Sequence, residues 1–192
     1  MRSLLLVAAL ASVAHAQAPG QTVQTAPGVI DRRWSVDLAL GPTILKAKTD
    51  GAKGVLFLGL ELAARFRIRR EVEVALAFDA AGNQGIGLVG FFAEGRYRFN
   101  AERAWNPFVL VSLGVESVAD KTGSSTEKQG RGALRIGGGV ERRFGAWATS
   151  ATLRLVGIGE NKSVMTDTTA GEKLSRYGTS GGELVIGGTF YW

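Results

Sequence analysis

Apolar and polar residues alternate with a period of two along most of the chain. Residues 71–80 read E-V-E-V-A-L-A-F-D-A, in which large apolar side chains occupy every second position. This period is typical of a β-strand whose two faces meet different surroundings. We therefore predict a succession of two-faced strands.

Similar stretches follow one another to the last residue. Their predicted ranges are 33–45, 54–69, 71–80, 85–99, 105–117, 130–144, 146–158 and 182–192. The first half of 85–99 is apolar at both alternating sets of positions, so the pattern leaves its inward face undefined. An even number of two-faced strands of ~10 residues is typical of a closed membrane barrel. We predict an all-β fold, an eight-stranded antiparallel up-and-down transmembrane β-barrel over residues 32–192.

The connections between the predicted strands differ in length at the two ends. Residues 69–70, 100–104 and 145 form short connections, whereas 46–53, 81–84, 118–129 and 159–180 are mostly longer and polar. Bacterial barrels place short turns in the periplasm and longer loops outside the cell. We expect the same arrangement here.

The first residues predict export. Arg2 precedes an apolar run over 4–13, and Ala14 and Ala16 form an A-x-A cleavage site. The run is too short for a spanning helix, which needs ~20 residues. We predict a signal peptide over 1–16 and a flexible periplasmic lead-in over 17–31, where Gln, Thr, Ala and Pro are frequent.

Alternation alone does not show which face points outward, because a soluble lipocalin-like barrel has the same period with its apolar face inside. The aromatic residues favour a membrane barrel, since they gather near the short-turn ends of the strands. There they would form a girdle at the lipid interface. The predicted girdle comprises Trp34, Phe66, Tyr97, Phe99, Trp105, Phe144 and Trp147, joined by Phe190 and Trp192.

The charged residues are also sorted by type. Lysines fall in or beside the long connections, whereas the polar strand faces carry arginine with glutamate or aspartate. The planar guanidinium suits bidentate pairing in a confined space, and a lysine ammonium is better hydrated. We predict a narrow lumen filled by small residues and by ion pairs among Glu61, Arg65, Arg67, Glu73, Glu94, Arg96, Arg98, Glu116, Arg131, Arg135, Glu141, Arg143, Arg154 and Glu183.

The last stretch reads G-E-L-V-I-G-G-T-F-Y-W, and its outward set includes Leu184, Ile186, Phe190 and Trp192. This pattern resembles the assembly signal of bacterial outer-membrane barrels. The whole chain after residue 16 is similar to the small eight-stranded barrels of the OmpA transmembrane-domain and OmpX type. The resemblance implies a location in the bacterial outer membrane, contact with its lipid, and assembly by the barrel-assembly machinery.

Composition limits the chemistry. The chain has no cysteine, and its one histidine, His15, lies in the predicted signal peptide. A thiol or Ser–His nucleophile is therefore excluded from the mature chain. We expect no catalytic residue, cofactor or metal.

The net charge of +6 would normally suggest that the protein binds nucleic acid. The basic residues belong to the loops and the lumen, which argues against such a function. Gly85, Gly87 and Gly90 match a nucleotide-binding spacing but open a strand, so we attribute the match to chance.

The basic loops suggest a partner. Phosphates of lipopolysaccharide would face Lys46, Lys48, Lys53, Lys121, Lys128, Lys162, Lys173 and Arg176 if these loops are extracellular.

We predict a non-enzymatic integral outer-membrane barrel with a structural or surface-interaction role and a plugged lumen. One alternative is a narrow channel or conduit for small or apolar solutes, of the OmpW type. The other is a soluble periplasmic ligand-binding barrel.

Overall fold

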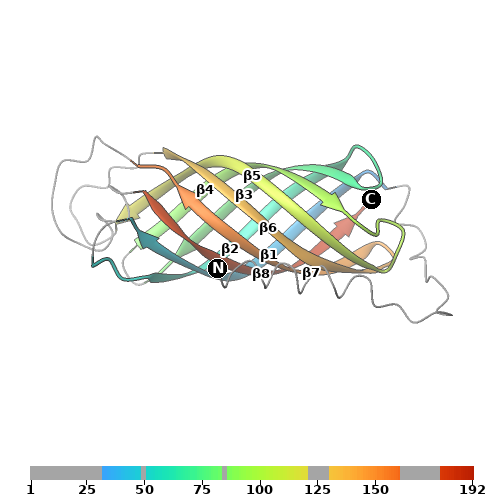
Figure 1. The fold of residues 1–192 in the computed structure, drawn as a ribbon. Coiled ribbons are helices and arrows are strands. Elements are labelled where there is room, and N and C mark those ends of the chain that lie inside the picture. The colour runs from blue at the N-terminus through green and yellow to red at the C-terminus, as the bar shows by residue number, and fades with distance from the viewer. Residues whose placement is uncertain (1–31, 49–50, 84–85, 121–129, 161–177) are drawn as a thin grey trace.

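The computed structural model describes residues 32–48, 51–83, 86–120, 130–160 and 178–192. Within them the chain forms one closed barrel in which each strand pairs antiparallel with its neighbours in sequence and the first pairs with the last (Figure 1). The strands are β1 Trp34–Ala47, β2 Val55–Arg67, β3 Val72–Gly82, β4 Ile86–Arg98, β5 Trp105–Asp120, β6 Gly130–Phe144, β7 Trp147–Ile158 and β8 Thr179–Tyr191. The predicted fold class is confirmed, and the predicted signal peptide and lead-in lie outside the described residues.

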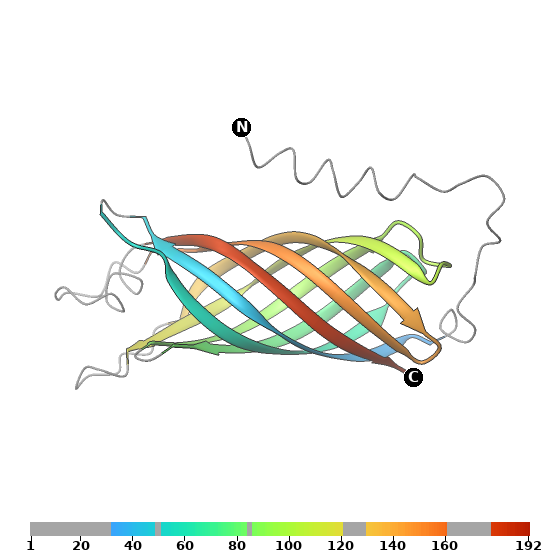
Figure 2. The same cartoon turned by 90° about the horizontal axis from the view of Figure 1, so that it is seen from below.

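The strands are inclined to the long axis of the barrel, as the two views show (Figure 2). Several run further than the apolar pattern predicts. β1 continues to Ala47 and β8 begins at Thr179, because these two residues pair with each other. Backbone hydrogen bonding between neighbours extends the ladder beyond the residues that alternate. No helix in the described part of the chain is long and apolar enough to cross a membrane.

The two ends of the barrel differ. At one end, which we call the short-turn rim, the strands are joined by residues 68–71, 99–104 and 145–146. Gly145 has a φ of 66°, the left-handed conformation that a tight turn needs. The opposite end, the long-loop rim, carries the connections 48–54, 83–85, 121–129 and 159–178. The β3–β4 connection is as short as the turns of the other rim, so the difference in length rests on the remaining three.

The predicted orientation of the faces is confirmed. Leu76 and Leu58 on the apolar face have exposed fractions of 73% and 69%, whereas Arg65 and Glu141 on the other face have fractions of 1% and 0%. The structure also defines the first half of β4, where Ile86 and Leu88 point inward. The soluble-barrel alternative required the opposite arrangement, so the structure contradicts it.

The lumen has two sections of different chemistry. Charged side chains fill the section that extends from the short-turn rim to the middle of the barrel. Nearer the long-loop rim the strands bury an apolar plug, which consists of Leu45, Phe57, Ile86, Leu88, Val156 and Ile158. The prediction of a lumen filled by ion pairs and small residues was therefore wrong for this section. Apolar residues occupy both faces of the strands there, and an eight-stranded interior is narrow enough for such side chains to fill.

Candidate functional site

The outer surface carries an aromatic girdle beside the short-turn rim. Each tryptophan of the chain lies in it, with exposed fractions between 50% for Trp34 and 60% for Trp147. The rings contact one another across strands, since Trp34 lies 4.8 Å from Phe66 and Trp147 lies 4.7 Å from Phe190 between ring centroids. Phe66 is half-buried against its neighbour. The remaining rings predicted for the girdle are exposed: Tyr97, Phe99, Trp105, Phe144 and Trp192.

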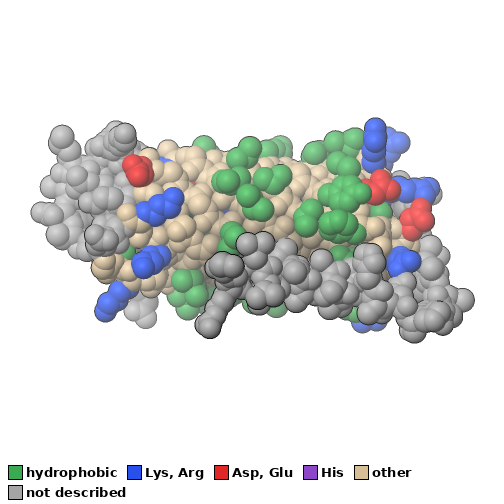
Figure 3. All heavy atoms as spheres, viewed as in Figure 1, with side chains coloured by type: hydrophobic (Ala, Val, Ile, Leu, Met, Phe, Trp, Pro, Cys, Tyr) green, Lys and Arg blue, Asp and Glu red, His purple; other side chains and the backbone are tan. Residues whose placement is uncertain are grey.

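Between the rims the outer surface is apolar. Charged side chains gather at the two ends of the barrel and hydrophobic ones between them (Figure 3). Among strand residues whose side chains the structure describes, the charged ones that point outward are Lys46, near the long-loop rim, and Arg142, in the girdle. A surface of this kind is costly in water and is what contact with lipid hydrocarbon requires.

The lumen contains a balanced set of charges. All the predicted lumen residues point inward, and the structure adds Asp37 and Asp79, which the prediction omitted although both lie on polar strand faces. The described arginines and carboxylates then match in number. They are Arg65, Arg67, Arg96, Arg98, Arg131, Arg135, Arg143 and Arg154, with Asp37, Glu61, Glu73, Asp79, Glu94, Glu116, Glu141 and Glu183.

The layer nearest the short-turn rim is centred on Tyr191, to which the sequence pattern assigned no role. Its buried hydroxyl donates to Glu141 Oε2 at 2.9 Å and accepts from Arg98 Nη2 at 2.7 Å. Arg98 Nη2 also lies 2.7 Å from Glu73 Oε2. The Arg67 and Arg143 side chains complete this layer: Arg67 Nε donates to Glu73 at 3.1 Å, and Arg143 Nε donates to Glu141 at 2.7 Å.

The next layer joins three strands through Arg65. Its guanidinium bridges Asp37 on β1 and Glu94 on β4. Arg96 lies 3.6 Å from Glu94 and 4.1 Å from the ring centroid of Phe108. This layer is therefore held both by ion pairs and by a cation–π contact.

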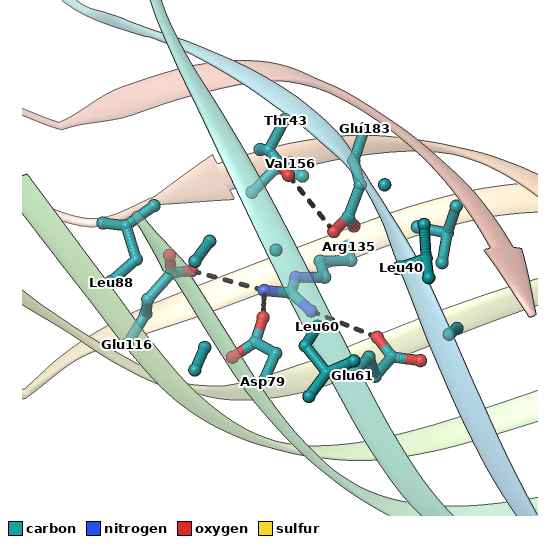
Figure 4. Close-up of a pocket in the computed structure, with 16 residues that line it drawn as sticks. Leu40, Thr43, Leu60, Glu61, Asp79, Leu88, Glu116, Arg135, Val156 and Glu183 are labelled. Atoms are coloured by element: carbon teal, nitrogen blue, oxygen red, sulfur yellow. Dashed lines mark hydrogen bonds and ion pairs between the residues drawn. The ribbon is translucent and has the colours of Figure 1, made fainter. Parts of the chain in front are cut away.

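The layer in the middle of the barrel contains two arginines and four carboxylates. Both terminal nitrogens of Arg154 donate hydrogen bonds to Glu61, one to each carboxylate oxygen. The distance from Nη2 to Oε1 is 2.8 Å. Arg135 pairs with Asp79 and lies 3.6 Å from Glu116 and 3.7 Å from Glu61, as Figure 4 shows. The remaining carboxylate, that of Glu183, lies 3.3 Å from Arg154 and accepts a hydrogen bond of 3.3 Å from Thr43.

The ion pairs and the apolar plug meet at Arg135. Its guanidinium lies 3.7 Å from the ring centroid of Phe92, a buried residue that packs with the plug. Beside it is a cavity of about 20 Å³, lined by Glu61, Asp79, Glu116, Glu183 and Val156 among others. A space of this size holds about one water molecule. Arg131 lies closer to the long-loop rim and donates to the Gly159 carbonyl oxygen at 3.3 Å.

The loop lysines are only partly described. Lys46, Lys48 and Lys53 are exposed at the long-loop rim. The other predicted contacts to lipopolysaccharide, which are Lys121, Lys128, Lys162, Lys173 and Arg176, lie outside the described residues.

In the part of the chain that the structure describes, no group of His, Cys, Asp and Glu residues is arranged to hold a metal ion.

No family model matches the chain, and no curated protein matches its sequence. Solved structures do match. Neisserial surface protein A is similar with a TM-score of 0.68 and 17% identity, over 83% of this chain and 97% of that one.

Two proteins of Pseudomonas aeruginosa are also similar. The outer membrane protein OprG gives a TM-score of 0.53 at 13% identity, over 86% of this chain and 98% of that one. The N-terminal barrel domain of OprF gives 0.51 at 16% identity, over 83% and 98%. The chain thus has the fold of the eight-stranded bacterial outer-membrane barrels.

Proposed function

We propose that the protein is an integral barrel of the bacterial outer membrane, with a structural or surface-interaction role and no enzymatic activity. The observation that carries this proposal is the separation of its faces, with apolar side chains outside and equal numbers of arginines and carboxylates inside. Membrane flotation of the native protein tests the location. The protein should float with lipid and need detergent for release, whereas recovery as a soluble protein would contradict the proposal.

We further propose that the lumen is closed to ions and solutes. Charged layers span the lumen from the short-turn rim to its middle, the apolar plug fills much of the remainder, and the cavity between them is about 20 Å³. Recording in planar bilayers should therefore show no stable openings, with a porin in the same bilayers as the positive control. Reproducible single-channel steps would favour the narrow conduit instead.

The exposed lysines of the long-loop rim support contact with lipopolysaccharide phosphates. Lys46, Lys48 and Lys53 would face the outer leaflet if the short turns are periplasmic. Replacing all three with glutamine should reduce the lipopolysaccharide that co-purifies with the barrel. The matched control replaces Arg33, Arg69 and Arg70, which are exposed at the other rim. This contact would be contradicted if the lysine variant lost no lipopolysaccharide, or lost only as much as the arginine control.

The outward face of β8 supports recognition by the barrel-assembly machinery. Leu184, Ile186 and Phe190 are exposed on the lipid side of this strand, and Trp192 follows them. Changing Phe190 and Trp192 to aspartate should block insertion and leave export intact, as judged by accumulation of the processed chain in the periplasm. Normal insertion of this variant would count against an assembly role.

A further inference from the structure

Arg142 is a cation on the largely apolar outer surface of the strands. It points outward from β6 within the aromatic girdle, and Lys46, the other outward charge of the described strand residues, lies near the opposite rim. An arginine facing lipid is costly unless it lies at the interface and its donors find a partner. Its position therefore calls for an explanation beyond the packing of the barrel.

Two aromatic rings hold the guanidinium in place. Its central carbon lies 5.2 Å from the ring centroid of Trp105 on β5 and 4.9 Å from that of Phe144, two residues along β6. Both contacts are within the range of a cation–π interaction. They fix the height and position of the cation and restrict its freedom to turn away into the water beyond the rim.

The guanidinium has no acidic partner in the described part of the chain. It contacts the two rings instead, in contrast to lumen arginines such as Arg154, which lies beside Glu61. Thr149 of β7 is paired with Arg142 in the sheet and is exposed, so a hydroxyl lies on the same outer face. Neighbours directly opposite on two strands have Cβ atoms ~5 Å apart, close enough to share one small ligand.

We propose that Arg142, Trp105, Phe144 and Thr149 form a binding site for the phosphate of a phospholipid headgroup. A guanidinium presents a planar fork that matches phosphate oxygens, and a membrane leaflet places phosphates at the level of the aromatic girdle. The rings would contact the upper part of the acyl chains while Arg142 and Thr149 donate to the phosphate. The site rests on the proposed membrane location and assigns to it a lipid class, a phospholipid of the leaflet beside the short-turn rim.

Native mass spectrometry of the intact barrel, released by mild detergent from vesicles of phosphatidylethanolamine and phosphatidylglycerol, tests the site. Arg142→Gln should lower the phosphatidylglycerol retained per barrel by at least about threefold, and Arg142→Lys should lower it less, because it keeps the charge without the fork. Arg69→Gln is the matched control, since it removes an exposed arginine of the turn 68–71 at the same rim, and it should leave retention unchanged.

Unchanged retention in Arg142→Gln, or an equal loss in Arg69→Gln, would overturn the proposal. Thr149→Val provides a second variant, which keeps the contacts of Arg142 with Trp105 and Phe144. It should reduce the phosphatidylglycerol retained even if Arg142→Gln fails to fold. Flotation of each variant with the vesicles is measured in parallel. A native chain that does not float would overturn the proposed membrane location, whereas normal flotation with unaltered retention overturns the lipid site alone.

Discussion

The hydroxyl of Tyr191 on β8 donates a hydrogen bond of 2.9 Å to Glu141 on β6 within the lumen. These strands are not neighbours, because β7 lies between them. Arg98 of β4 donates to the same Glu141 oxygen at 3.0 Å and so brings a third strand into the contact. The lumen therefore connects strands that the backbone ladder does not join, and the closing strand takes part through an inward side chain.

Tyr191→Phe should lower the free energy of unfolding by about 2 kcal/mol, because it removes a buried hydroxyl bonded to two charged groups. Urea-induced unfolding in lipid vesicles measures the change. Tyr97→Phe is the matched control, since Tyr97 is 47% exposed in the girdle, and it should have little effect. Equal stabilities for the two variants would show that the Tyr191 hydroxyl contributes nothing to the barrel.

The pair of Arg154 and Glu61 should show strong coupling. Arg154→Met leaves Glu61 buried near Glu94 and Glu183 without its main partner, which should cost about 3–5 kcal/mol. Combining it with Glu61→Leu removes the unpaired charge and should recover much of the loss. A double-mutant cycle on unfolding measures the coupling, and simple additivity of the two single changes would contradict the direct pairing.

The alternation of apolar and polar residues was sufficient to predict the faces of the strands, because a period of two leaves one inward set wherever the sets differ in polarity. It did not settle the first half of β4, where both sets are apolar and closure of the barrel places Ile86 and Leu88 inside. The same ambiguity concealed the apolar plug. Where both sets of alternating positions are apolar, the pattern does not show which set faces the lumen.

The pairing of the lumen charges could not be predicted either. Arg154 and Glu61 are 93 residues apart and lie on β7 and β2, which do not pair. Their contact depends on the tilt and stagger of the strands, which set the height of each residue in the lumen. Those quantities arise from closure of the whole sheet. Arg142 illustrates another limit, since only the register of β5 with β6 shows that the cation lies beside Trp105.

Gly181 is predicted to permit the close approach of β8 to β1. A Cβ atom at this position would overlap the backbone carbonyl oxygen of Ile44 on β1. Gly181→Ala should therefore separate β8 from β1 or strain their pairing, and we expect a loss of about 1–3 kcal/mol. Gly132→Ala on β6 is the matched control, because nothing lies within 4 Å of its added Cβ.

Resistance of the folded barrel to detergent before and after heating measures the effect of these glycine changes. The Gly181 variant should lose its compact form at a lower temperature than the Gly132 variant. The close approach of β8 to β1 would be contradicted if both variants behaved as the native protein does.

A charge in the middle of the outer surface should be costly only if lipid is there. Leu76 is 73% exposed near the centre of β3, so Leu76→Arg would be almost harmless in water. In a bilayer it should lower the free energy of unfolding by about 2–4 kcal/mol, whereas Tyr97→Arg in the girdle should cost about 0–1 kcal/mol. Equal effects at the two positions, measured by unfolding in vesicles, would contradict the depth assigned to them.

The central claim is that the apolar face of every strand contacts lipid and the charged face lines the lumen. Because the chain contains no cysteine, single cysteines placed in turn at positions 73–78 of β3 can each carry a spin label. Electron paramagnetic resonance then measures the collision of each label with oxygen, which concentrates in the bilayer interior. The claim predicts high collision rates at 74, 76 and 78 and low rates at 73, 75 and 77. A uniform profile, or the opposite phase, would contradict it.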